Sequence, residues 1–287
     1  MRSRPRHFET RQILRDVIDR ALIVAHKEDV TRLVSSLEAE GLKVDVLRPD
    51  YTKEEMTYSK NSRTFLNHRN AWQKAVEVDN YTLICEADFV PCRGIGNFEV
   101  FWPIDNPRAW GYLYQGSPRL LAVVDSEQFL RGRAAPLVCY VVNKNVASLM
   151  LMYSEYAKRA YDLRSYFMFD AYLQRYIGAL GAEAFIPLYH YGEHGGLANP
   201  EHATLGFLSN KGQHRADNLM SYLHFLPTYA NGNYWSFIRV RLGARLLGFA
   251  RLATGRWISR TNLYSLRPLD IFKMYLIGVW RLISLPL

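Results

Sequence analysis

Two carboxylates separated by one residue, Glu86 and Asp88, are the side chains in this sequence best suited to hold a hard divalent cation. Mg²⁺ and Mn²⁺ prefer oxygen ligands, commonly one or two carboxylates together with the phosphates of a substrate. A cation held in this way can neutralise a departing diphosphate. A simpler interpretation stays open, because charged side chains are also common where a strand leaves the core for solvent.

The segments that precede the acid pair place it at the edge of a predicted sheet. Residues 64–76 have apolar side chains at helical spacing, and residues 81–85 form a short continuous apolar run typical of a buried strand. Open α/β sheets bind ligands beyond the carboxyl ends of their strands. A strand that ends in Glu86 and Asp88 therefore indicates a ligand site at that edge.

A histidine occurs on the apolar face of the same predicted helix. His68 shares that face with Phe65 and Trp72. We expect a core histidine satisfied by a hydrogen bond, in preference to a ligand.

The first part of the chain is typical of an α/β protein. Residues 21–25, 29–41 and 43–47 predict a strand, a helix and a second strand, which form a βαβ unit. No G-x-G-x-x-G sequence occurs, so the dinucleotide-binding fingerprint is absent. Further strands are predicted at 110–114, 120–124 and 136–142, followed by a helix at 145–158.

The segment around the acids resembles the family 25 glycosyltransferases of bacterial lipopolysaccharide synthesis. The resemblance lies in F-L-N-H at residues 65–68, Ala71-Trp72, and L-I-C-E-A-D at residues 83–88. Asn67 replaces the usual serine, and Ala87 replaces the middle acid of the family's L-E-D-D. The resemblance implies a GT-A-like, Rossmann-type, mostly parallel sheet with flanking helices. It also implies a nucleotide-sugar donor, Mn²⁺ or Mg²⁺ on the acid pair, and inversion at the anomeric carbon.

Further donor-binding residues follow from the same resemblance. The polar stretch from His26 to Arg32 is similar to the family's stretch after its first strand, with Arg32 on the matching arginine. These residues would bind the donor together with Glu86 and Asp88. An exposed helix residue without a ligand is an equally good interpretation of Arg32.

The resemblance also implies a catalytic base and a further metal ligand. Asp170 matches the acid of the family's D-x-x-L segment, although an acid at a helix N-terminus is also favoured by the macrodipole. Residues 184–189 match its final strand, and the loop after them carries His190 and His194. Either histidine could complete the metal site, or both could be ordinary polar loop residues.

Composition limits the class and the compartment. At 287 residues and 49% hydrophobic content, the chain can form a substantial core. Its three cysteines form no C-x-x-C pair, which argues against a zinc knuckle or a disulfide framework and favours a reducing compartment. The N-terminal residues lack the apolar segment of a secretory signal. We therefore expect a cytoplasmic protein, with a catalytic domain at residues 1–220.

The remaining residues, 221–287, are predicted to form a basic amphipathic helical region. From residue 231 onward there are nine basic residues and one acid. On a helix, Arg241, Arg245 and Arg251 share one arc, opposite aromatic and aliphatic side chains. This pattern is typical of a helix lying in an anionic membrane interface. The alternatives are core packing with a solvated basic rim and, with weaker support because no recognition motif accompanies the charge, nucleic-acid binding.

The sequence therefore predicts a glycosyltransferase that moves a hexose from a nucleotide sugar. The family resemblance points to galactose or glucose as that hexose. The acceptor would be a lipid-linked or lipopolysaccharide saccharide at the inner face of the cytoplasmic membrane. Two alternatives belong to other classes: a membrane-bound saccharide or nucleotide-sugar binder without activity, and a basic nucleic-acid-binding protein.

Overall fold

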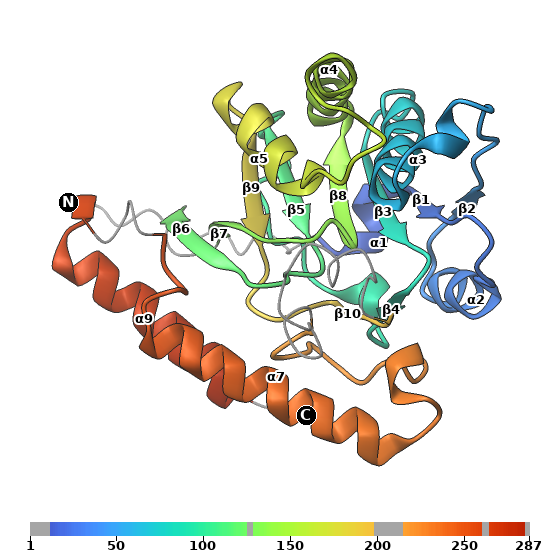
Figure 1. Ribbon diagram of the computed structural model, residues 1–287. Coiled ribbons are helices and arrows are strands. Elements are labelled where there is room, and N and C mark those ends of the chain that lie inside the picture. Colours follow the sequence, from blue (N-terminus) through green and yellow to red (C-terminus); the bar gives the residue numbers. More distant parts are fainter. Residues whose placement is uncertain (1–11, 125–128, 198–214, 260–263, 285–287) are drawn as a thin grey trace.

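A mixed eight-stranded sheet organises the protein. The computed structural model describes residues 12–124, 129–197, 215–259 and 264–284. The strand order is β2-β1-β3-β8-β5-β9-β7-β6, and a separate two-stranded sheet pairs β10 with β4 (Figure 1). The strands are β1 (Ile18–Val24), β2 (Val44–Leu47), β3 (Tyr81–Glu86), β4 (Phe89–Pro91), β5 (Ala109–Tyr112), β6 (Arg119–Val124), β7 (Phe129–Arg133), β8 (Cys139–Asn143), β9 (Glu183–Ile186) and β10 (Gly192–His194).

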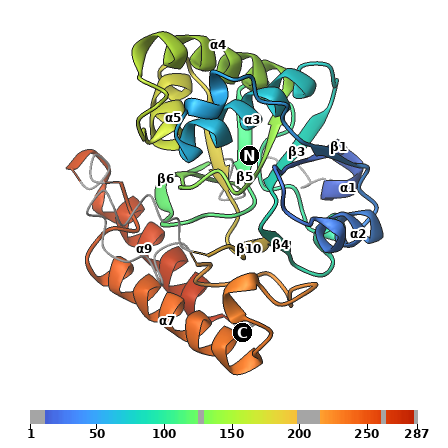
Figure 2. The same cartoon turned by 45° about the vertical axis from the view of Figure 1, so that its right-hand side comes forward.

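Helices cover both faces of the large sheet. The helices are α1 (Leu14–Val17), α2 (Thr31–Ala39), α3 (Lys60–Ala75), α4 (Lys144–Ala160), α5 (Phe169–Ala179), α7 (Tyr234–Ala253) and α9 (Pro268–Ile283), with 3₁₀ turns at Glu55–Thr57, Ile95–Asn97 and Thr228–Ala230. In Figures 1 and 2, α3, α4 and α5 lie together on one face, and α2 lies on the other. Each face has its own apolar cluster. The predicted α/β class is confirmed.

The strand directions place the acid pair at an edge of the sheet where the loop after β1 also lies. β1 pairs in parallel with both β2 and β3, whereas β8 runs antiparallel to β3 and β5. β7 is also reversed relative to β9 and β6, so six of the eight strands point in one direction. The carboxyl ends of β1 and β3 consequently lie side by side.

Helix α3 forms where the sequence predicts it, with a clear start. The Ser59 side chain caps it by accepting a hydrogen bond from the backbone N–H of Ser62. Its buried face includes Phe65, Trp72 and Ala75, each fully buried. This face packs against α4 and the sheet, so the helix fixes the position of His68 relative to β3.

The C-terminal helices α7 and α9 pack against each other and against the rest of the protein. Leu252, Trp257, Met274 and Leu282 belong to the same apolar cluster as α3 and α4. The C-terminal helices therefore share an apolar core with α3 and α4.

Two arginines of the C-terminal helices are buried inside the protein. Arg241, one member of the predicted basic arc of α7, is only 5% exposed, and Arg281 of α9 is 1% exposed. Both arginines bind carboxylates inside the protein, Glu193 and Asp217 respectively. Other sides of the same helices carry exposed apolar side chains, such as Leu246 of α7 and Phe272 of α9.

In the described part of the chain, no helix is both long and apolar enough to cross a membrane.

Candidate metal and donor site

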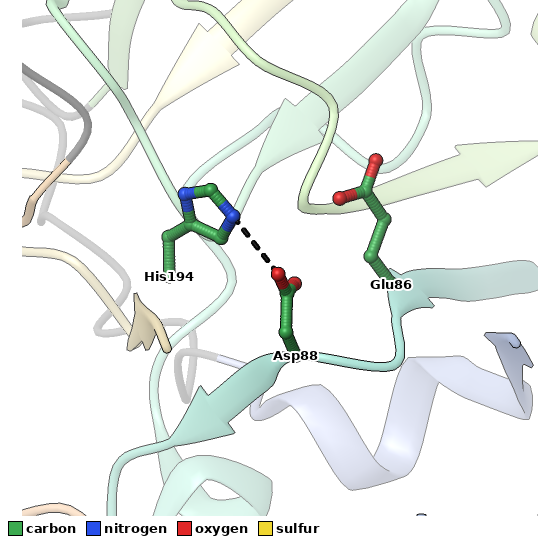
Figure 3. A group of neighbouring side chains, drawn as sticks. All are labelled: Glu86, Asp88 and His194. Carbon is green, nitrogen blue, oxygen red and sulfur yellow. Dashed lines mark hydrogen bonds and ion pairs between the residues drawn. The ribbon is translucent and has the colours of Figure 1, made fainter. Parts of the chain in front are cut away.

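Three side chains converge where β3 ends. Glu86 is the last residue of β3, and Asp88 follows in the turn to β4. β10 pairs antiparallel with β4 in a register that places His194 opposite Phe89, so the histidine meets the acids (Figure 3). One ligand atom from each of Glu86, Asp88 and His194 lies within 4.8 Å of the others.

The closest pair in this cluster is charge-assisted. His194 Nε2 lies 3.0 Å from Asp88 Oδ2, and the two side chains are 17% and 33% exposed. Burial of Asp88 would raise the pKa of its carboxyl, but His194 and Arg215 outweigh burial and hold that pKa below its usual value. Burial likewise lowers the pKa of His194, and the Asp88 carboxylate overcomes this and raises it. The pair therefore holds an ionised carboxylate.

The chemistry of these side chains fits a divalent cation. Among the described residues, buried Asp88 Oδ1 and His194 Nδ1 have no hydrogen-bond partner. A buried polar atom left unsatisfied costs about 1–3 kcal/mol, so both atoms favour an additional ligand. Two carboxylates and an imidazole are donors that Mn²⁺ accepts.

A pair of glycines allows the histidine loop to approach Asp88. The backbone N–H of Gly195 donates to the Asp88 carbonyl at 2.7 Å. A Cβ on Gly196 would lie 1.9 Å from Asp88 Oδ2, so a side chain there would displace the carboxylate. The Arg215 guanidinium fixes the same loop by donating to the carbonyls of His194 and, at 2.7 Å, of Gly196.

His68 is buried as expected, but its partner is one of the acids. His68 Nε2 lies 3.2 Å from Glu86 Oε1, and Nδ1 lies 2.9 Å from the Tyr140 hydroxyl. The indole N–H of Trp72 donates to the same hydroxyl at 2.8 Å. All three bonds are satisfied if Tyr140 O–H donates to Nδ1 and Nε2–H donates to Glu86. This chain of hydrogen bonds orients the Glu86 carboxylate from the core.

Ala87, the residue between the two acids, faces the apolar cluster and not the candidate metal site. The backbone N–H of Ala87 donates to the Val24 carbonyl at 3.1 Å, and its side chain packs against the apolar cluster on the α2 face. A third acid at residue 87 would therefore point toward apolar side chains and not toward Glu86 and Asp88.

The loop after β1 lies next to the acid pair because β1 and β3 are parallel neighbours. Arg48 donates to the carbonyls of His26 and Glu28 at 2.6 and 2.9 Å, and the His26 ring lies 5.5 Å from that of Tyr51. Arg32 is exposed in the first turn of α2. The structure thus places both predicted donor-binding residues on the loop and helix that follow β1.

Asp170 lies in the first turn of α5, on the α3 side of the sheet. The ring of its neighbour Phe169 is 5.8 Å from the His68 ring, and His68 binds Glu86. The N-terminus of α5 is therefore close to the acid pair.

His190 does not join the cluster, contrary to its expected role as a metal ligand. It is fully buried, its Nδ1 accepts the backbone N–H of Gln115, and its Nε2 lies 3.0 Å from Asp217 Oδ1. Both ring nitrogens are therefore engaged. Burial, with help from Arg281 and Arg241 and against the effect of Asp217, lowers the pKa of His190 to about 4.

The arginines of α7 and α9 support the strand that carries His194. Arg241 Nη1 lies 3.2 Å from a carboxylate oxygen of Glu193, the residue before His194. Arg281 Nη2 lies 2.6 Å from Asp217 Oδ1. Burial of Asp217 would raise the pKa of its carboxyl, but Arg281 and His190 hold it well below its usual value.

Sequence reasoning missed Arg215, Tyr140 and the supporting role of Glu193. Tyr140 lies within a correctly predicted strand, where alternation indicates which face a side chain takes but not which atom it binds. Arg215 and Glu193 lie in segments without periodicity, so no pattern in the sequence marks them.

Comparison with known proteins gives little. No protein-family model matches the chain, and no curated protein sequence matches it. Among solved structures, a glycosyltransferase involved in the glycosylation of the major capsid of PBCV-1 overlaps 58% of this chain and 80% of its own, with 8% identity and a TM-score of 0.38. A likeness of this size does not establish a shared fold or activity.

Proposed function

We propose that this protein is a metal-dependent glycosyltransferase that uses a nucleotide-sugar donor. The observation that carries the proposal is the convergence of Glu86, Asp88 and His194 at the carboxyl end of β3. Two of their buried atoms lack a partner among the described residues. The acids also occur within the segment that resembles family 25 glycosyltransferases.

Glu86, Asp88 and His194 would hold the cation. Bound there, Mn²⁺ or Mg²⁺ would neutralise the charge that develops on a departing diphosphate. The imidazole favours Mn²⁺ of the two, because Mg²⁺ is usually held by oxygen atoms alone. His68 would keep the Glu86 carboxylate oriented, as residues behind metal ligands commonly do.

The loop after β1 would contact the donor. It adjoins the acid pair, and the N-terminus of α2 that follows it favours negative charge such as phosphate. Arg32, exposed in the first turn of α2, adds a guanidinium that can bind phosphate oxygens. His26 lies in the same loop and would contact the nucleotide or its ribose.

Asp170 would act as the base. An inverting transfer needs one group to remove the proton of the acceptor hydroxyl while the sugar moves directly from donor to acceptor. The position of Asp170 in the first turn of α5, next to a residue that contacts His68, supports this role. The resemblance suggests a hexose as the transferred sugar and a lipid-linked or cell-surface saccharide as the acceptor, at the inner face of the cytoplasmic membrane.

The test is Mn²⁺-dependent hydrolysis of a panel of nucleotide hexoses by the full chain, together with Mn²⁺ affinity by electron paramagnetic resonance. Asp88→Asn and Glu86→Gln should each lower Mn²⁺ affinity and donor hydrolysis at least tenfold. Asp79→Asn is the matched control, because Asp79 is an exposed acid at the opposite end of β3. Unchanged Mn²⁺ affinity in both acid variants would overturn the metal role.

A second variant separates an enzyme from a binder without activity. Asp170→Asn should keep donor and Mn²⁺ affinity and lose transfer, because a base acts on the acceptor and not on the diphosphate. Wild-type protein that binds Mn²⁺ and nucleotide sugar but shows no turnover with any donor in the panel would favour the binder.

A further inference from the structure

The two C-terminal helices expose an apolar surface that the sheet does not cover. Figures 1 and 2 show α7 and α9 side by side along one edge of the protein, outside the sheet. We call their outward residues the apolar face. Its members are Trp235 (78% exposed), Leu242, Leu246 (70%) and Phe249 of α7, and Leu269, Phe272, Leu276, Val279, Trp280 and Ile283 of α9.

The outer side of these helices differs from that of an ordinary water-exposed helix. Such a helix turns its apolar side toward the core and its charges toward water. Here Arg241 and Arg281 are buried against carboxylates, and large apolar side chains point outward. The inward arginines are held by the protein, so the outward side chains need an apolar environment that the described part of the chain does not supply.

Charge on and around the apolar face fits an anionic lipid surface. Arg239 is exposed and follows Trp235 by four residues, and exposed Lys273 follows Leu269 by four, so each cation lies on an apolar stripe. Long basic side chains can lie along apolar surface while their charge reaches the headgroups. The only acid after residue 231 is Asp270, which is 2.9 Å from Arg267.

The aromatic residues favour the same environment. Trp235 and Trp280 are exposed on the face, and Tyr264 nearby is 90% exposed. Tryptophan and tyrosine prefer the boundary between hydrocarbon and headgroups. A second copy of the chain fits less well, because a two-fold contact would bury the cations of both copies, and the one acid of this region, Asp270, is already paired with Arg267.

We propose that the apolar face of α7 and α9 docks onto an anionic membrane, with both helices lying in the plane of the headgroups. The docking surface does not include Glu86, Asp88 or His194, and binding requires no nucleotide sugar. The inference rests on the membrane location named in the proposed function and assigns the surface that makes the contact, and its test uses no nucleotide sugar, so failure of the two can be told apart.

Tryptophan fluorescence of the full chain provides a direct probe. Four of the six tryptophans, Trp72, Trp102, Trp110 and Trp257, are 5% exposed or less, so an environment change on docking reports on Trp235 and Trp280. Vesicles of phosphatidylglycerol and phosphatidylcholine should shift the emission to shorter wavelength. Vesicles with brominated acyl chains should quench it. Binding should be at least tenfold tighter than to phosphatidylcholine alone and should fall only in part at high salt.

Variants of the face decide between a lipid surface and other partners. Leu246→Glu combined with Phe272→Glu should weaken vesicle binding at least tenfold and leave donor hydrolysis in solution unchanged. Met152→Glu is the matched control, because Met152 is 52% exposed on α4, away from the face, and should bind vesicles like wild type. Equal binding by the double variant, or no binding by wild type, would overturn the proposal. A wild-type dimer in sedimentation velocity that the double variant dissociates would overturn it in favour of self-association.

Discussion

Replacing Arg281 by methionine should strongly destabilise the protein. Arg281 is 1% exposed, and its partner Asp217 has a side chain that is 6% exposed, so the substitution leaves a carboxylate buried without its cation. Removal of one partner from a buried ion pair costs about 3–5 kcal/mol. For a chain of this size, that loss lowers the melting temperature by roughly 6–20 °C.

The cost should depend on pH in a defined direction. The pKa of Asp217 is held well below its usual value, so its contribution is present above the unfolded pKa of about 3.9 and is lost as pH falls below it. Without Arg281, burial becomes the main influence on Asp217 and favours the protonated form. The difference between variant and wild type should therefore be largest near pH 7 and shrink toward pH 4.

Urea unfolding followed by near-ultraviolet circular dichroism measures the effect. Arg239→Met is the control, because Arg239 is exposed on α7 and should change stability by about 0.5 kcal/mol or less. Adding Asp217→Asn to Arg281→Met removes the unpaired charge and keeps a partner for His190, so most of the loss should be recovered. An Arg281→Met variant within 1 kcal/mol of wild type at pH 7 would refute the packing of α9 described above, by the magnitude expected for a buried pair.

Three other predictions concern the candidate metal site and the buried histidines near it. Gly196→Ala should lower Mn²⁺ affinity at least tenfold because its Cβ would meet Asp88. Gly178→Ala is the control, because its Cβ would enter open space. Equal Mn²⁺ affinities for the two variants would contradict this prediction. His68→Leu should weaken Mn²⁺ binding about 10–100-fold by releasing Glu86, as measured by electron paramagnetic resonance. Because the folded pKa of His190 is about 4 and the unfolded pKa about 6.5, folding stability should fall by about 3 kcal/mol from pH 7 to pH 4, and His190→Gln should flatten that slope in urea titrations.

The part of the site that is contiguous in the sequence could be predicted, and the part that comes from a distance could not. Helix α3, strand β3 and the two acids follow one another within 30 residues, so local periodicity placed them. His194 reaches Asp88 only through the pairing of β10 with β4, two three-residue strands whose register no local pattern specifies. The sequence therefore offered His190 and His194 as equals.

The orientation of α7 shows a different limit. Periodicity correctly divided the helix into a basic arc and an apolar arc. It could not show that Glu193 would be fully buried beneath Arg241, because that carboxylate lies 48 residues earlier in the chain. Charge partners, and not hydrophobicity alone, decide which arc faces the protein.

The bracing of β10 by the last helices has a consequence for how the protein is made. Glu86 and Asp88 leave the ribosome first, and His194 follows roughly 5–20 s later at ordinary rates of translation. Arg281, which pairs with Asp217, is a further 87 residues along the chain from His194. A nascent chain therefore carries the acids without their complete support. Synthesis of α9 is the step after which the loop has its full support, so chains that stop before α9 should bind Mn²⁺ weakly.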